Sequence, residues 1–361
     1  MSRNNNFNLL RIVAAIAVLI SHAYPLALGP GTTEPLDGVL GISLGTLAVL
    51  TFFAISGYFI FQSFDRRADL IEFVAARVLR IYPALIVVLL LTVFVLGPLL
   101  TNLSLRSYFS DPGTILYIPR NLRLWSMQYD LPGVFSANGY QAINGSLWTL
   151  LYEVACYASV VMFGSLSVLN RRTLAAAFVA YVGLYILAFS VLPATGHERL
   201  LRHNIHLLSL PFFLGMALYH LRKTVPLRPF ILVFLLAVAV GSYNRPWFHE
   251  AFVLAWCYGI FCLGFAQWRP LLAYNRLGDY SYGTYIYAWP IAQVIVLLFK
   301  DCGPLLVISL SLPFTLLLAA LSWHIVEVKA LSRKVVAAAW IRRSIRLDVA
   351  PRSVSNANDQ R

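Results

Sequence analysis

Two ionisable side chains stand out in the sequence because they lie inside long apolar runs. His22 lies in the run 9–28 and Glu153 in the run 147–166. A charged residue at the centre of a membrane helix costs roughly 2.5–3.5 kcal/mol, so such residues are expected to serve a function. A carboxylate orients a neighbouring imidazole and stabilises the imidazolium, which makes such a pair a common general base. The two residues therefore predict proton-transfer chemistry within a membrane.

The depth of His22 and Glu153 is expected to be similar. Each lies about six residues from the predicted outer end of its run, or roughly 9 Å along a helix. A histidine and a carboxylate at equal depth can form a pair. The alternative is that both residues only join neighbouring helices through polar contacts.

Arg11 is a third ionisable residue in the first run, eleven positions before His22. Eleven residues are about three helical turns, or roughly 16 Å, so Arg11 and His22 lie on one face of a helix. Arg11 either belongs to the same site or extends toward the inner headgroups.

A second basic feature precedes the run 81–100. It consists of Arg66, Arg67, Arg77 and Arg80. Arg77 and Arg80 are three positions apart and share a helix face. Arginine suits multidentate recognition of phosphate, whereas ordinary anchoring at the cytoplasmic surface explains the same charges.

These residues are carried by an unusually apolar chain. Hydrophobic residues make up 59% of the 361 residues and charged residues 12%, about half the charged share of soluble domains. Ten apolar runs are each about long enough to span a bilayer, although one is short. They are centred near 9–28, 44–63, 81–100, 147–166, 173–192, 205–221, 229–243, 251–267, 283–299 and 304–324. The sequence therefore predicts an all-α, polytopic membrane helical bundle with about ten transmembrane helices.

The basic residues predict the orientation of this bundle. Cytoplasmic segments collect Lys and Arg, and alternating the runs from a cytoplasmic N-terminus places most of these residues inside. Both termini are then cytoplasmic, with a transmembrane domain at 1–326 and a basic cytoplasmic tail at 327–361. The net charge of +13 follows from this topology, so no nucleic-acid partner is expected; the partners expected are membrane lipids.

No metal site or disulfide framework is expected. The four cysteines form no metal-type pair. His197, His203 and His206 crowd one predicted outer loop, and contact with water explains them as well as metal binding does. A longer outer loop, 101–145, is rich in aromatic residues and is too aromatic for a disordered linker.

Five sequence motifs resemble those of the acyltransferase-3 family of bacterial membrane O-acyltransferases. In order they are Arg11 and His22 with ten residues between them, FFAISGYFIF (52–61), RVLRIYP (77–83), LPGVF (131–135) with NGSLWTLLYEVACY (144–157), and LGDYSYGTYIYAWPI (277–291). Each motif alone is weak, but the five in this order are specific, and they cover nearly all of the runs.

The resemblance implies an enzyme of the bacterial inner membrane. Such an enzyme transfers an acyl group, expected to be acetyl, from acyl-CoA (acetyl-CoA) in the cytoplasm to a hydroxyl of a cell-surface or exported carbohydrate or glycolipid. It implies His22 as the catalytic histidine, Arg11 as its signature partner and Glu153 as the membrane acid. The CoA phosphates are expected at Arg77 and Arg80, within the basic segment that also holds Arg66 and Arg67.

The acceptor is expected near the outer end of the run 147–166. Asn144, Ser146 and Trp148 lie at this position, and Ser56, in the second motif, is a further candidate for contact with substrate. Aromatic residues of the outer loop could stack on sugar rings. Separate polysaccharide-biosynthesis proteins are possible partners.

The sequence departs from the family pattern at two positions. Ala288 stands where many members have a histidine, and Val328 follows Glu327 where a proline is usual. Two mechanisms stay open, direct attack of the acceptor on the thioester and an acyl-histidine relay through His22. The alternative functions are a proton-coupled secondary transporter or flippase, although no symmetric halves are found, and a structural membrane protein.

Overall fold

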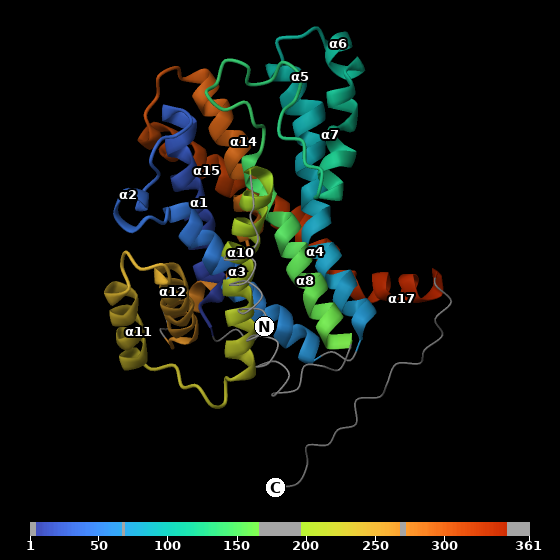
Figure 1. Ribbon diagram of the computed structural model, residues 1–361. Coiled ribbons are helices and arrows are strands. Elements are labelled where there is room, and N and C mark those ends of the chain that lie inside the picture. The colour runs from blue at the N-terminus through green and yellow to red at the C-terminus, as the bar shows by residue number, and fades with distance from the viewer. Residues whose placement is uncertain (1–4, 67–68, 166–195, 268–271, 345–361) are drawn as a thin grey trace.

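The computed structural model describes residues 5–66, 69–165, 196–267 and 272–344, and within them every regular element is a helix (Figure 1). The all-α prediction is confirmed. The helices are α1 (Phe7–Leu28), α2 (Asp37–Leu40), α3 (Leu44–Asp65), α4 (Leu70–Leu91), α5 (Gly97–Leu100), α6 (Leu105–Ser110), α7 (Pro112–Arg123), α8 (Thr149–Ser165), α10 (Gly196–His220), α11 (Pro229–Gly241), α12 (Phe248–Phe265), α14 (Ser281–Leu298), α15 (Pro304–Ser322), α16 (Val328–Ser332) and α17 (Lys334–Ser344).

Six helical segments of the described chain are long and apolar enough to cross a membrane. They are Phe7–Leu28, Leu44–Asp65, Leu70–Leu100, Gly145–Met162, Phe248–Phe265 and Pro304–Ser332. Helices α10, α11 and α14 coincide with further predicted runs, and the run 173–192 lies outside the described residues. The chain is a membrane protein, and the count of ten spans stays a prediction.

Helices α1 and α3 form the centre of the bundle. Helix α1 packs against α3, α14 and α15, and α3 also packs along α10. The crossing of α3 and α10 depends on glycine: a Cβ on Gly57 would lie 1.9 Å from the carbonyl oxygen of Phe212, and one on Gly215 would lie 2.1 Å from that of Ala54. Small residues allow such close helix contacts within membranes. This packing buries one face of α1, including Val18, Leu19 and Ser21, whereas Val13 and Leu28 are exposed.

Helix α4 begins well before the predicted run 81–100. It starts after Asp69, whose side chain accepts hydrogen bonds from the backbone N–H groups of Ile71 and Glu72, a standard N-cap. It continues through a π-helical turn, Thr92–Leu96, into α5. The residues before the run are therefore helical, and Arg77 and Arg80 sit on a rigid element.

The predicted outer loop, 101–145, contains ordered structure. Helices α6 and α7 lie beside the end of α4 and α5 (Figure 1). Tyr108 and Tyr117 are buried, and the Tyr108 hydroxyl donates to the carbonyl oxygen of Val93, 3.0 Å away. Trp125, in contrast, is 74% exposed.

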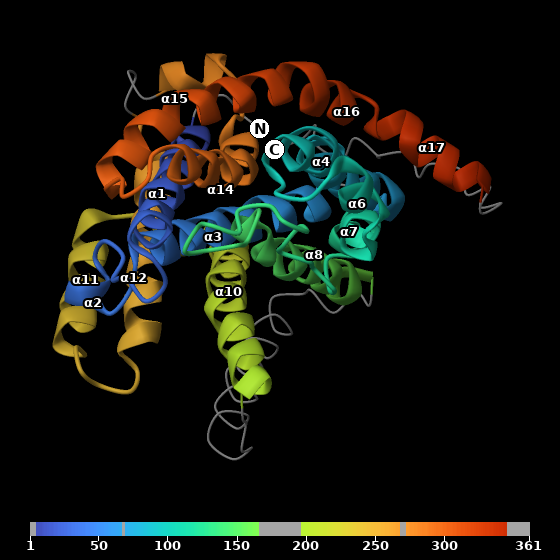
Figure 2. The same cartoon turned by 90° about the horizontal axis from the view of Figure 1, so that it is seen from above.

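The helical path of the chain continues beyond the predicted domain boundary at residue 326. A π-helical turn, Trp323–Glu327, joins α15 to α16, and α17 follows, so that the three helices form one arc (Figure 2). Helix α17 packs against α4, where Arg342 pairs with Asp69 and the Lys334 Nζ lies 4.0 Å from Glu72.

Candidate active site

A cavity of about 400 Å³, lined by both charged and apolar side chains, lies among α1, α3, α4, α8 and the start of α14. Its volume is within the usual range for small-molecule sites. Several residues predicted from the sequence line it: Arg11, Ser56, Arg66, Arg77, Arg80 and Glu153. The fold thus gathers residues from four helices at one place, whereas Arg67 lies outside the described residues.

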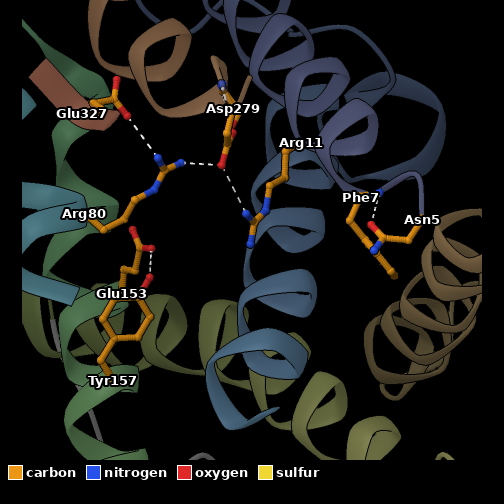
Figure 3. Close-up of polar contacts among 9 residues, drawn as sticks. Asn5, Phe7, Arg11, Arg80, Glu153, Tyr157, Asp279 and Glu327 are labelled. Atoms are coloured by element: carbon orange, nitrogen blue, oxygen red, sulfur yellow. Dashed lines mark hydrogen bonds and ion pairs between the residues drawn. The ribbon is translucent and has the colours of Figure 1, made fainter. Parts of the chain in front are cut away.

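Four charged residues beside this cavity form a network, here called the Arg–Asp cluster: Arg11, Arg80, Asp279 and Glu327 (Figure 3). Asp279 Oδ2 lies 2.7 Å from Arg80 Nη2 and 3.4 Å from Arg11 Nη1. The other Arg80 nitrogen, Nη1, lies 3.1 Å from Glu327 Oε2. The network joins α1, α4, the start of α14 and the π-helical turn after α15.

The charge of Asp279 is stabilised by its two arginines. Burial alone raises the pKa of this carboxyl, but Arg80 and Arg11 more than offset the burial and hold the pKa below its usual value. The Ser281 hydroxyl also donates to Asp279. Asp279 is therefore ionised at neutral pH, and Arg80 has two carboxylate partners within the protein.

Arg77 has different surroundings from Arg80. Its guanidinium lies over the rings of Phe73 and Tyr157, 5.8 and 5.9 Å from their centroids. Arginine on aromatic faces keeps its charge and its planar array of donors. Arg77 therefore presents a positioned positive charge at the cavity, as phosphate binding requires.

Glu153 lies at the cavity and accepts a hydrogen bond from Tyr157, one turn later on α8 (Figure 3). In the described chain no hydrogen bond or ion pair joins Glu153 to His22. The catalytic pairing of these two residues stays a prediction.

His22 lies three turns along α1 from Arg11, outside the set of residues that line the cavity. Its ring contacts Trp289 of α14 in an edge-to-face arrangement, with centroids 4.8 Å apart. Its Nδ1 is buried, and no partner for it is found in the described chain. A buried polar atom without a partner is costly, so this nitrogen is a candidate for contact with a ligand.

The three predicted acceptor residues differ in their surroundings. Asn144 donates to the carbonyl oxygen of Ile286, 2.8 Å away, and accepts from the N–H of Ser146, so its side chain already attaches the chain before α8 to α14. The Ser146 hydroxyl is buried and has no partner among the described residues. Trp148 packs against Tyr152.

Sequence reasoning missed Asp279 and Trp289, and it assigned no role to Glu327. Asp279 and Trp289 both belong to the motif LGDYSYGTYIYAWPI (277–291), but the motif does not reveal their partners. Tyr157 could have been found, because it follows Glu153 by four positions on one helix.

Several apolar helices surround a site with partly buried charges and a partly buried histidine. This arrangement is typical of membrane-embedded enzymes and of transporters. The model of the acyltransferase domain family matches residues 4–324. The chain therefore belongs to this acyltransferase family, which confirms the resemblance and favours an enzyme over a transporter.

Two relatives support this assignment. An O-acetyl transferase of Shigella phage Sf6 is 32% identical over 351 residues, covering 92% of this chain and 98% of the relative. Nodulation protein 10 of Rhizobium leguminosarum bv. viciae is 34% identical over 197 residues, covering 51% of each chain. No solved structure matches the chain.

Proposed function

We propose that this protein is an O-acetyltransferase of the bacterial inner membrane that moves an acetyl group from acetyl-CoA to a hydroxyl of a cell-surface or exported carbohydrate. Family membership supports acyl transfer, and the name of the phage relative supports an acetyl group and an oxygen acceptor. The observation that carries the proposal is the arginine-lined cavity three turns from His22 on one helix.

The donor is assigned to the arginine-lined cavity. Coenzyme A carries several phosphates, and arginine binds phosphate through paired, charge-assisted hydrogen bonds. Arg66 and Arg77 line the cavity and are assigned to these phosphates. Arg80 already has Asp279 and Glu327 as partners, so its role is to hold the cavity together. This division refines the prediction that Arg77 and Arg80 act alike.

The acceptor is assigned to the opposite end of α1, near His22. Ser146 has an unused hydroxyl beside Gly145, which contacts Trp289, and Trp148 lies two residues later. A buried hydroxyl without a partner suits a hydrogen bond to a sugar hydroxyl. Proteins that synthesise or export the polysaccharide would deliver this acceptor.

In the proposed reaction His22 acts as the general base. His22 takes the proton of the acceptor hydroxyl while the oxygen of that hydroxyl bonds to the thioester carbon. The carbon–sulfur bond breaks, and the proton passes from His22 to the departing CoA thiolate. Glu153 and Arg11 belong to the donor side of this arrangement, because both line the cavity.

The alternative is a relay in which His22 first takes the acetyl group from CoA and then passes it to the acceptor. Mass spectrometry of the protein incubated with acetyl-CoA and no acceptor separates the two mechanisms. An acetyl adduct on His22 that disappears when acceptor is added would favour the relay, and its absence at short reaction times would favour direct attack.

The proposed function is tested by transfer of labelled acetyl from acetyl-CoA into surface glycans, in membranes that contain the wild-type protein or His22→Ala. His203→Ala is the matched control, because His203 is exposed. Label should enter glycan with wild type and His203→Ala and not with His22→Ala. Equal labelling with His22→Ala would exclude His22 as the base, and no acetyl-CoA-dependent labelling across the cell's glycan fractions would contradict the function.

A further inference from the structure

The His22 imidazole packs against the indole of Trp289 on α14. The two rings lie edge to face, 4.8 Å apart and inclined by 72°. In the described chain no hydrogen bond reaches His22, and its buried Nδ1 has no partner. Packing against Trp289 therefore orients the His22 imidazole. In many other enzymes a carboxylate orients the catalytic imidazole.

Trp289 is itself held from three sides. Its indole N–H donates to the carbonyl oxygen of Ala142, 2.9 Å away, and Tyr140 packs edge to face against it. Gly145 lies against its ring: a Cβ at this position would lie 2.7 Å from the ring carbons, a distance that real Cβ atoms do not adopt. The indole therefore has little freedom to change its rotamer.

The chain segment that holds Tyr140, Ala142 and Gly145 also contacts α14 one helical turn after Trp289. Gln293 donates to the carbonyl oxygens of Tyr140 and Ala142, at 2.8 and 2.7 Å, and Asn138 donates to Gln293. The segment 138–148 contains Ser146 and Trp148, which were assigned to the acceptor. Trp289 therefore connects this segment directly to His22.

We propose that Trp289 is a positioning residue that fixes the His22 imidazole for proton transfer. Because Trp289 also contacts the segment 138–148, a shift of this segment moves the imidazole. This inference rests on the proposed function, because it assumes that His22 takes a proton from the acceptor. Trp289 does not line the donor cavity, so its effect falls on the rate of the reaction and not on donor binding.

The test uses four forms of the full-length protein: wild type, Trp289→Phe, Gly145→Ala and the double variant. The methyl group of Gly145→Ala must displace the indole, so kcat should fall by about tenfold or more, since misplacing a reacting group by an ångström can cost about 10²-fold. The KM for acetyl-CoA should stay unchanged. A Phe ring is shorter, so the double variant should recover much of the kcat lost in Gly145→Ala, and Trp289→Phe alone should lose only severalfold.

A second measurement does not depend on acetyl transfer. Carbethoxylation of His22 by diethylpyrocarbonate, followed by mass spectrometry with exposed His203 as internal standard, should be several times faster in Gly145→Ala than in wild type and slower again in the double variant. Unchanged modification together with additive effects on kcat would overturn the inference. If wild type transfers no acetyl while the modification rates follow the expected order, the proposed function fails and the role of Trp289 in positioning His22 stands.

Discussion

The Arg–Asp cluster and the surroundings of His22 lie along one helix, α1, and they differ in how their polar groups are matched. In the cluster, Asp279 has two arginines and Arg80 has two carboxylates. Around His22, the imidazole Nδ1 and the Ser146 hydroxyl are buried, and neither has a partner in the described chain.

From this difference we expect the cluster to stabilise the fold and the residues around His22 to contact the substrate. A buried charge is tolerated when a partner of opposite charge is present. A buried polar atom with no protein partner costs about 1–3 kcal/mol, unless an ordered water or a ligand supplies the missing hydrogen bond. We therefore expect changes in the cluster to affect stability and changes around His22 to affect catalysis.

The largest effect on stability is expected for Asp279→Ala. It leaves Arg11 and Arg80, whose side chains are only 14% and 18% exposed, with one partner fewer. Removing one member of a buried ion pair costs about 3–5 kcal/mol. The thermal unfolding temperature in detergent should fall well below that of wild type, whereas Asp130→Ala, at an exposed position, should not change it. Equal unfolding temperatures for the two variants would show that the cluster does not stabilise the fold.

The pH dependence of this effect follows from the lowered pKa of Asp279. A carboxyl whose folded pKa is below its unfolded value of about 3.9 stabilises the protein above that value, and the stabilisation is lost as the pH falls through the folded pKa. The difference in unfolding temperature between wild type and Asp279→Ala should therefore be constant between about pH 6 and 8. A difference that grows with pH over this range would contradict the assignment.

An intermediate effect is expected for Arg77→Ala, on donor binding. A lost charge-assisted hydrogen bond costs about 1.5–3 kcal/mol, so the KM for acetyl-CoA should rise by at least about tenfold. Arg77→Lys keeps the charge but loses the planar array of donors, so its KM for acetyl-CoA should lie between those of wild type and Arg77→Ala. Arg276→Ala is the control, since Arg276 is an exposed arginine of the turn before α14. A KM for Arg77→Ala equal to that of Arg276→Ala would remove Arg77 from the donor site.

The smallest effect is expected for Trp125→Ala, in the predicted outer loop. The side chain is 74% exposed, so its removal should leave the unfolding temperature unchanged. If it stacks on a sugar ring, the loss of about 0.5–1.5 kcal/mol raises the KM for the acceptor by roughly two- to tenfold. Leu105→Ala, another exposed apolar position in the same region, should leave this KM unchanged. Identical KM values for the two variants would remove Trp125 from acceptor binding.

Much of the fold could be predicted from the sequence. Apolar runs of spanning length predict helices directly, because the bilayer leaves few alternatives for the backbone. Motif spacing also identified Arg11, Ser56, Arg77 and Glu153, which the structure brings to one cavity.

The partners of these residues could not be predicted, because they are distant in sequence. Asp279 is 268 positions from Arg11 and 199 from Arg80, and only the packing of α1, α4 and α14 brings them together. Trp289 and His22 are also distant in sequence, and the packing of α1 against α14 brings them together. Periodicity within a run shows which face of a helix a residue occupies, but not which helix that face meets.

The most direct test of the account measures unfolding temperature and acetyl transfer in the same preparations of wild type, His22→Ala and Asp279→Ala. His22→Ala should unfold within a few degrees of wild type, because in the described chain no hydrogen bond depends on this residue, yet transfer should fall by about 10²-fold or more. Asp279→Ala should lose stability in the same comparison. Wild-type transfer by His22→Ala, or a loss of stability equal to that of Asp279→Ala, would contradict the central claim that His22 is the catalytic residue.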